Sequence, residues 1–411
     1  MASRVTDRDS AVRAFVQDRR GELIDFAREL IATPSPNPPG DERAVAEVAM
    51  QAMHELGYAR VDAVARADTR PNVVGEIGTG SRSLLLNGHL DTQPPGDLDA
   101  WRTPPWDPQI DDGRLYGLGA SDMKGAVAAM VYAGGAVAAA GDLDGTLRVV
   151  LTADEEAGSS FGARFLADEG LVRADAALVG EAPGDDPWEY LAVAARGTSR
   201  FHIRIRGTQM HSGLTDRLPS VNASVKMAQL LARMAAEFEP RFDPLPGLPG
   251  RPAVNLGVVV EGGISFSFCP PEASFGTDVR TLPGMTFEEL RADLEGFLES
   301  ARREDPELDA ELEWLPEMAW FPPCSIESSH PLVTATRSSA EEVLQRQVPL
   351  GLMPAFTDGS RWAAAGIACI PAFGPGSLAL AHRPNEYVAV PEVVDAATIY
   401  GLTAVRFLGA A

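Results

Sequence analysis

Cysteine is scarce in this chain of 411 residues. Its three cysteines, Cys269, Cys324 and Cys369, are widely spaced and odd in number. They therefore form neither a disulfide framework nor a CxxC metal knuckle, and they suit a protein kept in a reducing compartment.

Long hydrophobic runs are also missing. The first residues alternate charged with apolar side chains and lack the apolar core of a signal peptide. The most apolar stretch, residues 125–140, is rich in Ala and Gly and is shorter than the roughly 20 residues that span a bilayer. We therefore expect a soluble cytoplasmic protein without a membrane partner, in which this stretch forms a buried helix.

Basic residues are in short supply. Lys and Arg number 35 against 58 Asp and Glu, which gives a net charge of -23. A phosphate-backbone partner requires clustered Lys and Arg, so the composition argues against nucleic acid. A small anionic substrate is still compatible with this charge, provided that local arginines hold it.

The hydrophobic and charged fractions, 45% and 23%, are those of an ordinary globular protein, and the length favours two domains. Apolar runs at 84–86, 147–151 and 176–179 each end in polar or acidic residues, as buried parallel strands do. Helical patterns separate or precede them, at 12–33, 42–56, 124–140 and 160–169. The first part of the chain is therefore predicted to be α/β.

The pattern changes near Arg196. Residues 201–206 alternate apolar and polar side chains, which indicates a strand with one solvated face. Predicted helices at 220–238 and 286–302 and predicted strands at 253–261, 272–280 and 309–314 complete a compact α+β region. The α/β pattern resumes after Pro322-Pro323. We therefore predict a catalytic domain, 1–195 and 318–411, interrupted by an inserted domain, 196–317.

Polar residues with metal-binding chemistry follow the predicted strands. They are His89, Asp91, Glu155, Glu156 and Glu181. In open α/β sheets, ligands bind at the carboxyl ends of the strands. A mixed nitrogen and oxygen donor set suits Zn, Co or Mn and argues against metals held by thiolates.

Each of these motifs also has a plain structural explanation. In His89-Leu90-Asp91 the two polar side chains point the same way, so one could bind metal while the other orients it; a surface turn explains the pair equally well. Asp122 precedes a helix whose N-terminus favours a carboxylate, but Ser121 or Asp122 could simply cap that helix.

The carboxylates of Asp154, Glu155 and Glu156 repel one another unless a cation or solvent compensates. With a metal, one could ligate it while its neighbour takes a proton from the bound water; without one, this is a solvated acidic loop. Glu181 is open to both interpretations as well. Of the histidines, His382 follows a Gly-Pro-Gly loop and His211 lies in the insert, and we interpret the other candidates, His54, His202 and His330, as structural.

Several short motifs follow one another along the chain. They are His89-Leu90-Asp91-Thr92, Pro94-Pro95-Gly96-Asp97, Trp101, Pro104-Pro105-Trp106 and Gly117-Leu118-Gly119-Ala120-Ser121-Asp122-Met123-Lys124-Gly125. With the segments around 155, 181, 211 and 382, they resemble the M20 metallopeptidase family, and within it the deacetylase and desuccinylase branch. The resemblance covers nearly the whole chain.

This resemblance implies a zinc-exopeptidase-like catalytic domain with a mixed, mainly parallel sheet, interrupted by a ferredoxin-like α+β lid and dimerisation domain. A homodimer is therefore expected. It also implies two divalent ions, zinc first, with cobalt or manganese as alternatives. His89 and Glu181 would bind one ion and Glu156 and His382 the other, with Asp122 as the bridge.

The remaining roles also come from the resemblance. Glu155 would be the general base, Asp91 would orient His89, and His211 would stabilise the tetrahedral intermediate, either within its own chain or across a dimer. The residues that match substrate contacts are Asn255, Arg280, Thr357, Arg361 and Gly376.

The implied activity is hydrolysis of the amide bond of an N-acyl amino acid, a small substrate that carries a carboxylate. Two alternatives stay open: a di-metal carboxypeptidase or dipeptidase that uses the same site, and a metal-free binding protein that has lost the chemistry.

Overall fold

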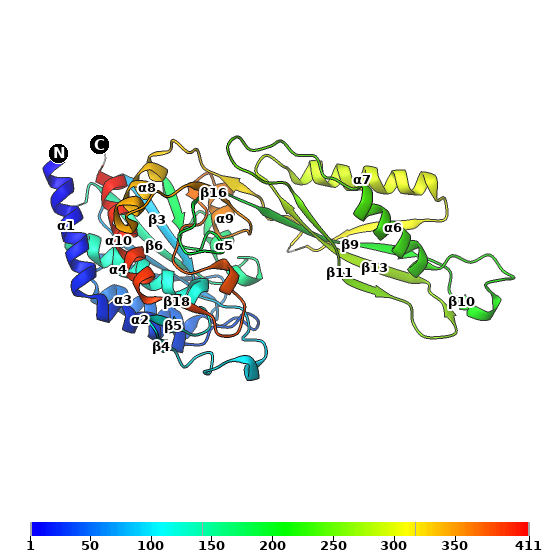
Figure 1. Cartoon of the computed structure of the whole chain (residues 1–411), viewed down its shortest axis with the longest axis horizontal. Coiled ribbons are helices and arrows are strands. Elements are labelled where there is room, and N and C mark those ends of the chain that lie inside the picture. The colour runs from blue at the N-terminus through cyan, green and yellow to red at the C-terminus, as the bar shows by residue number, and fades with distance from the viewer. Residues whose placement is uncertain (1, 142, 317, 410–411) are drawn as a thin grey trace. The chain divides into compact units, whose positions relative to one another are not determined.

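The computed structural model describes residues 2–141, 143–316 and 318–409 (Figure 1). The chain packs into two compact units. Unit 1 comprises Met1–Ala195 and Cys324–Ala411, and unit 2 comprises Arg196–Pro323. Among the helices of the described residues, none is long and apolar enough to cross a membrane.

Unit 1 is built on a six-stranded sheet with the order β1-β2-β6-β3-β7-β17. These strands are β1 (Arg60–Ala65), β2 (Pro71–Ile77), β3 (Arg82–His89), β6 (Gly145–Thr152), β7 (Ala176–Val179) and β17 (Ala368–Ile370). β3 runs parallel to β6 and β7, and β17 runs parallel to β7, whereas β1 and β2 are antiparallel to their neighbours. The prediction of a mixed, mainly parallel sheet is confirmed.

Helices cover both faces of this sheet. On one face α4 (Gly125–Ala139) and α10 (Val390–Gly409) contact β3 and β6. On the other face α5 (Ala163–Asp168) and α9 (Gly359–Ala364) enclose a core with Leu85, Val150 and Trp362. α4 is buried from Gly125 to Val137, as its Ala- and Gly-rich sequence predicts.

The other helices of unit 1 are α1 (Ala2–Asp18), α2 (Arg20–Ala32), α3 (Arg43–Glu55) and α8 (Pro331–Leu344). The single helix predicted over 12–33 is therefore wrong, because the backbone of Arg19 leaves helical geometry between α1 and α2. Two small sheets complete the unit. One joins β15 (Cys324–Ser325), β8 (Leu191–Ala195) and β16 (Leu350–Met353), and the other joins β18 (Tyr387–Ala389), β5 (Arg114–Tyr116) and β4 (Gln109–Asp111).

Unit 2 has a four-stranded antiparallel sheet with the order β11-β13-β9-β14. Its elements follow one another as β9 (Gly197–Arg206), α6 (Ala223–Glu237), β11 (Ala253–Gly262), β13 (Glu272–Thr281), α7 (Phe287–Glu304) and β14 (Asp309–Trp314). This βαββαβ order is the ferredoxin-like arrangement that was predicted. A short pair, β10 (Met210–His211) and β12 (Phe268–Cys269), lies outside the main sheet.

The alternation along β9 sorts its side chains by face. Phe201, Ile203 and Ile205 are buried against α6 and α7, whereas Arg204 lies on the other face, 2.6 Å from Glu313. The end of unit 2 differs from the expected boundary at 317: residues 318–323 belong to this unit, because Phe321 and Thr198 exchange two backbone hydrogen bonds.

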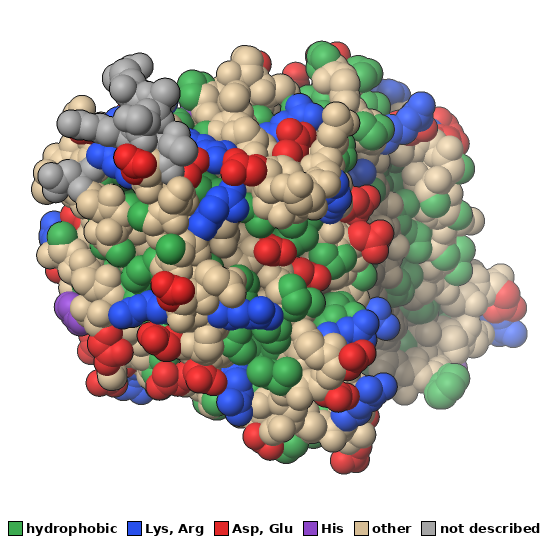
Figure 2. Space-filling model, turned by 60° about the vertical axis from the view of Figure 1, so that its left-hand side comes forward, with side chains coloured by type: hydrophobic (Ala, Val, Ile, Leu, Met, Phe, Trp, Pro, Cys, Tyr) green, Lys and Arg blue, Asp and Glu red, His purple; other side chains and the backbone are tan. Residues whose placement is uncertain are grey.

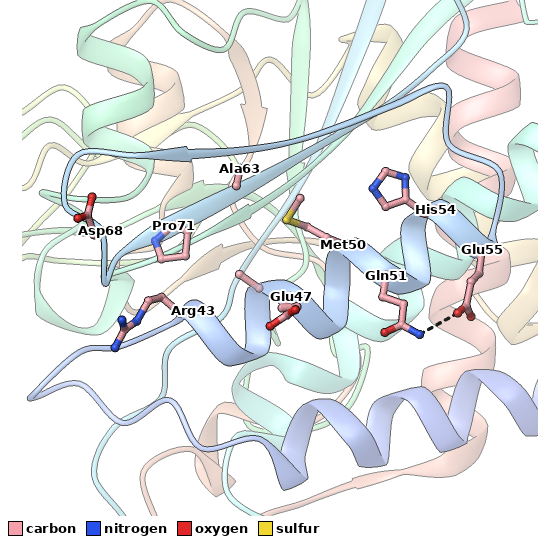
Figure 3. A pocket seen from close by; sticks show the side chains of 10 residues that line it. Arg43, Glu47, Met50, Gln51, His54, Glu55, Ala63, Asp68 and Pro71 are labelled. Atoms are coloured by element: carbon pink, nitrogen blue, oxygen red, sulfur yellow. Dashed lines mark hydrogen bonds between the residues drawn. The ribbon is translucent and has the colours of Figure 1, made fainter.

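The face of the molecule drawn in Figure 2 mixes Lys and Arg side chains with Asp and Glu side chains, and apolar side chains lie between them.

Candidate metal centre

Three neighbouring strands deliver polar residues to one edge of the unit 1 sheet. His89 is the last residue of β3, Glu155 and Glu156 follow β6, and Glu181 follows β7. Because β3 lies between β6 and β7 and is parallel to both, the three carboxyl ends meet at the same edge. Asp122 reaches this edge from the segment that precedes α4.

Asp122 lies at the centre of the cluster. His89 Nε2 is 3.0 Å from Asp122 Oδ1 and 3.2 Å from Glu181 Oε1. His382 Nε2 is 3.2 Å from Asp122 Oδ2 and 3.2 Å from Glu156 Oε2. The two oxygens of one carboxylate therefore face two different histidines, each of which has its own glutamate.

Two overlapping groups of residues could each hold a metal ion, because within each group the ligand atoms all lie within 4.8 Å of one another. One contains His89, Asp122 and Glu156, and the other contains His89, Glu155 and Glu181. The structure thus brings together all five predicted ligands and the predicted base. Within the described part of the chain, His54, His202 and His330 belong to neither group.

Burial dominates the electrostatics of these carboxylates. It raises the pKa of Glu181 to about 7, and it raises the pKa values of Glu155 and Glu156 as well. Hydrogen bonds to Asp122 and Glu156 raise the pKa of His382 to about 11. Burial also favours neutral Asp122, but its contacts with His382 and His89 outweigh that effect and lower the pKa of Asp122.

This donor set fits divalent cations. Several carboxylates that are costly to ionise lie against two imidazoles, of which His89 is buried and His382 half exposed, and a cation would relieve their repulsion. Moreover, Glu156 Oε1 is buried and has no hydrogen-bond partner among the described residues. Nitrogen and oxygen donors of this kind suit zinc, cobalt and manganese.

Asp91 contacts His89 differently from the prediction. His89 Nδ1 lies 2.9 Å from the backbone oxygen of Asp91 and 3.6 Å from its carboxylate Oδ1. The carboxylate instead accepts hydrogen bonds from the backbone N–H groups of Glu155 and Glu156, both at 3.2 Å. Asp91 therefore fixes the turn that carries the two glutamates, in addition to contacting His89 through its main chain.

Glu386 is a site residue to which the sequence assigned no role. Its buried carboxylate accepts backbone hydrogen bonds from Gly119 at 3.0 Å, Ser121 at 2.7 Å and Asp122 at 2.9 Å. Burial raises the pKa of Glu386 to about 8. The only local signal for this role is its place four residues after His382. Three other buried residues without an assigned role, Asn37, Arg70 and Asp154, lie behind the turn.

The predicted pocket residues of unit 1 have clear local contacts. Thr357 is buried, and its hydroxyl donates to the Pro371 carbonyl at 2.8 Å. Arg361 donates to the Gly158 carbonyl at 3.4 Å, beside the glutamate turn, and burial lowers its pKa to about 10. Gly376 has a φ of +89°, and a Cβ there would lie 2.3 Å from Ser121 Oγ. Glycine thus permits the close approach of this loop to the segment that carries Asp122.

The other predicted site residues belong to unit 2. His211 is exposed, and its Nδ1 accepts a hydrogen bond from Gly213 N at 3.0 Å, which leaves Nε2 to carry a proton in the neutral ring. Asn255 is an exposed residue of β11. Arg280 Nη2 lies 3.0 Å from Asp278 Oδ2.

Comparison with known proteins gives the family. The model of peptidase family M20/M25/M40 matches residues 85–406. The chain is 28% identical over 412 residues to N-formyl-4-amino-5-aminomethyl-2-methylpyrimidine deformylase of Bacillus subtilis (strain 168), covering 92% of this chain and 93% of that protein. It is 29% identical over 403 residues to succinyl-diaminopimelate desuccinylase of Xanthomonas euvesicatoria pv. vesicatoria (strain 85-10), covering 94% and 99%.

Among solved structures, the M20 family metallo-carboxypeptidase Sso-CP2 from Sulfolobus solfataricus has the same fold. Its TM-score is 0.74 at 18% identity, and the match covers 94% of this chain and 99% of that one. The protein therefore belongs to peptidase family M20/M25/M40 and is a hydrolase that acts on amide bonds.

Proposed function

We propose that this protein is a di-metal amidohydrolase that cleaves the amide bond of an N-acyl amino acid. The observation that supports the proposal most directly is the cluster around Asp122, in which two histidines lie 3.0 and 3.2 Å from its two carboxylate oxygens. Glu155 lies beside this cluster, within 4.8 Å of ligand atoms of His89 and Glu181.

In this proposal His89 and Glu181 would hold one ion, Glu156 and His382 would hold the other, and Asp122 would contribute to both sites. Zinc is the first expectation, with cobalt or manganese as alternatives. Two such ions supply an acidified water and a polarised substrate carbonyl.

Glu155 takes the proton of the attacking water and returns it to the leaving amine. A general base is most effective when its pKa is near the working pH, and burial moves the pKa of Glu155 upward from that of an ordinary glutamate. Its backbone N–H is held by Asp91, so the side chain starts from a fixed point.

Unit 2 supplies the remaining groups. The Nε2 proton of His211 donates to the oxyanion as the carbonyl becomes tetrahedral. Arg280 and Asn255 bind the carboxylate of the substrate, the arginine through its guanidinium fork. The proposed substrate is therefore a small molecule with one carboxylate next to the amide.

We also propose that the protein works as a homodimer joined through unit 2. β11 is an edge strand, and Val258, Val259 and Val260 along it are about half exposed. An exposed apolar edge strand readily pairs with another chain. His211 pairs with Phe268 in the β10–β12 pair, and β12 follows β11 in the chain. In this proposal the β10–β12 pair carries His211 toward the partner. Light scattering of the wild type and Val259→Lys would test this, because the charged variant should be monomeric.

A panel of amides tests the activity. The purified protein is loaded with Zn, Co or Mn, and acyl release is measured from N-acetyl and N-succinyl amino acids, dipeptides and N-formyl aminomethylpyrimidines. Turnover of the N-acyl amino acids supports the proposal, and turnover of dipeptides alone would replace it with the carboxypeptidase or dipeptidase alternative. A folded protein that binds no divalent ion would favour the metal-free binding protein.

The formylated pyrimidines belong in the panel for a specific reason. The deformylase relative matches the chain over nearly its whole length, and its name describes a formamide on a pyrimidine. Turnover of these compounds alone would identify the acyl group as formyl, and it would remove Arg280 from its proposed contact with a substrate carboxylate.

A further inference from the structure

Four polar side chains are buried behind the turn that carries Glu155, and neither the metal cluster nor the proposed chemistry uses them. They are Asn37, Glu42, Arg70 and Asp154, with between 0% and 7% of each residue exposed. They come from three segments of unit 1 that are far apart in the sequence. We call these four residues the Arg70 network.

Arg70 joins two of these carboxylates. Its Nε donates to Glu42 Oε2 at 2.7 Å, and its Nη2 donates to Asp154 Oδ1 at 3.0 Å. The guanidinium also lies over the ring of Phe161, 5.3 Å from the centroid. It passes so close to Gly40 that a Cβ there would be 2.2 Å from Nη1. The surroundings are thus shaped to a guanidinium group.

Asp154 is held from three sides. Besides Arg70, Asn37 Nδ2 donates to its Oδ1 at 3.1 Å and the backbone N–H of Phe161 donates to its Oδ2 at 3.1 Å. The Nδ2 group of Asn37 also donates to Asp91 Oδ2 at 2.9 Å. The Arg70 network therefore meets Asp91, whose carboxylate accepts the N–H group of Glu155.

The backbone of Asp154 explains why such a network is needed. Its φ of 65° and ψ of 20° place a non-glycine residue in the left-handed region, immediately before Glu155. This conformation costs Asp and Asn less than other residues with a side chain, but it still persists where surrounding contacts favour it. It also turns the chain sharply, so it decides in which direction the next side chain leaves the backbone.

We propose that Arg70 is a positioning residue that orients Glu155 by holding Asp154 in the left-handed conformation. The inference rests on the proposed function, because it has Arg70 position Glu155, the proposed general base. A lysine would replace it poorly, since its single flexible ammonium lacks the rigid fork through which Nε and Nη2 each contact a different carboxylate.

The test compares Arg70→Lys with Arg148→Lys in the full-length protein. Arg148 is a matched control, because it also pairs with a glutamate. Its Nε donates to Glu76 Oε1 at 2.7 Å, between β6 and β2 of the six-stranded sheet and away from the turn that carries Glu155. Hydrogen exchange by mass spectrometry follows the peptide 154–161, and kcat, KM and bound metal are measured for both variants.

In Arg70→Lys we expect exchange in 154–161 to become at least about tenfold faster, kcat to fall about 10- to 100-fold, and KM and the two bound ions to be retained. Arg148→Lys should change none of these. Unchanged exchange in Arg70→Lys would overturn the proposal whether or not any amide is cleaved. A loss of metal in step with activity would also overturn it, because Arg70 would then support a ligand instead of the base.

Asp154 gives a second pair of variants if Arg70→Lys does not fold. Asp154→Gly adopts the left-handed conformation freely but loses the carboxylate contacts, so it should repeat the faster exchange and the loss of kcat. Asp154→Asn still accepts from Arg70 and tolerates this conformation, although the Phe161 N–H group loses its acceptor, so it should keep more of kcat than Asp154→Gly. Wild-type kcat in Asp154→Gly would show that the Arg70 network does not position Glu155. Failure of the proposed function itself would appear separately, as a metal-loaded wild type that cleaves no amide.

Discussion

Glu386→Gln tests how the protein holds Asp122 in place. Glu386 Oε1 accepts from the backbone N–H groups of Ser121 and Asp122, and Oε2 accepts from Gly119 N. Glutamine keeps one oxygen for the first two donors, but its amide NH₂ then faces the N–H of Gly119. One buried donor loses its acceptor, which costs about 1–3 kcal/mol of unfolding free energy.

The same change should weaken metal binding. Asp122 is the residue that both histidines approach, and its main chain is one of the three groups that Glu386 fixes. Loss of a residue that orients a ligand typically lowers metal affinity about 10- to 100-fold. We therefore expect Glu386→Gln to bind divalent ions that much more weakly, as measured by titration against a chromogenic chelator, and to unfold at a lower urea concentration.

Asp175→Asn is the matched control for this prediction. Asp175 Oδ2 also accepts a backbone hydrogen bond, from Ser83 N at 2.7 Å, but near the start of β3, at the opposite end of the strand from His89. Because Asp175 is exposed and asparagine keeps one oxygen for Ser83, this variant should keep near-wild-type stability and wild-type metal affinity. If Glu386→Gln loses stability and binds metal as tightly as the wild type, Glu386 supports the fold alone and the reasoning fails.

The other predictions concern the base, the unit 2 histidine and pH. Glu155→Ala should keep the fold and the bound metal but lower kcat by about 10²- to 10⁴-fold; near-normal turnover would remove it from this role. His211→Ala should lower kcat without changing metal content, and mixing it with Glu155→Ala protein should restore activity if the histidine acts across a dimer. The pKa values of Glu181, Glu386 and His382 are raised to about 7, 8 and 11 in the metal-free protein. These three groups bind more protons in the folded than in the unfolded state and should lower the thermal midpoint as pH rises from 5 to 8, whereas Lys124, whose pKa burial lowers to about 7, opposes this near pH 8. Added metal should raise that midpoint more at pH 8 than at pH 6, because it binds the deprotonated ligands; an equal gain at both pH values would contradict this account.

Local patterns in the sequence predicted that part of the candidate cluster would come together. His89, Glu156 and Glu181 each follow an apolar run, and neighbouring parallel strands bring their ends to one edge. The periodicity of buried strands is visible in a single sequence, so the meeting of these residues follows from local patterns. The same reasoning gave the order of elements in the ferredoxin-like unit.

The positions of Asp122 and His382 in the cluster could not be predicted from local sequence patterns. Asp122 and His382 do not follow strands of the main sheet. They meet because β5 pairs with β18, with Tyr116 opposite Tyr387, and because Glu386 binds the backbone before Asp122. Strands of three residues are too short to show a period, and hydrogen bonds to main-chain groups do not depend on which residues donate them. Only the resemblance to a family placed these two residues in the site.

The acidic run at 154–156 shows why charge alone was ambiguous. The sequence allowed the same two explanations for all three carboxylates, namely a bound cation or solvent. In the structure Asp154 faces away from the cluster and is neutralised by Arg70, a residue 84 positions earlier in the chain. Glu155 and Glu156 are buried, or nearly so, among other acids, and within the cluster only His89 and His382 offer positive charge. The need for a cation therefore comes from two of the three carboxylates, and the third builds the turn that presents them.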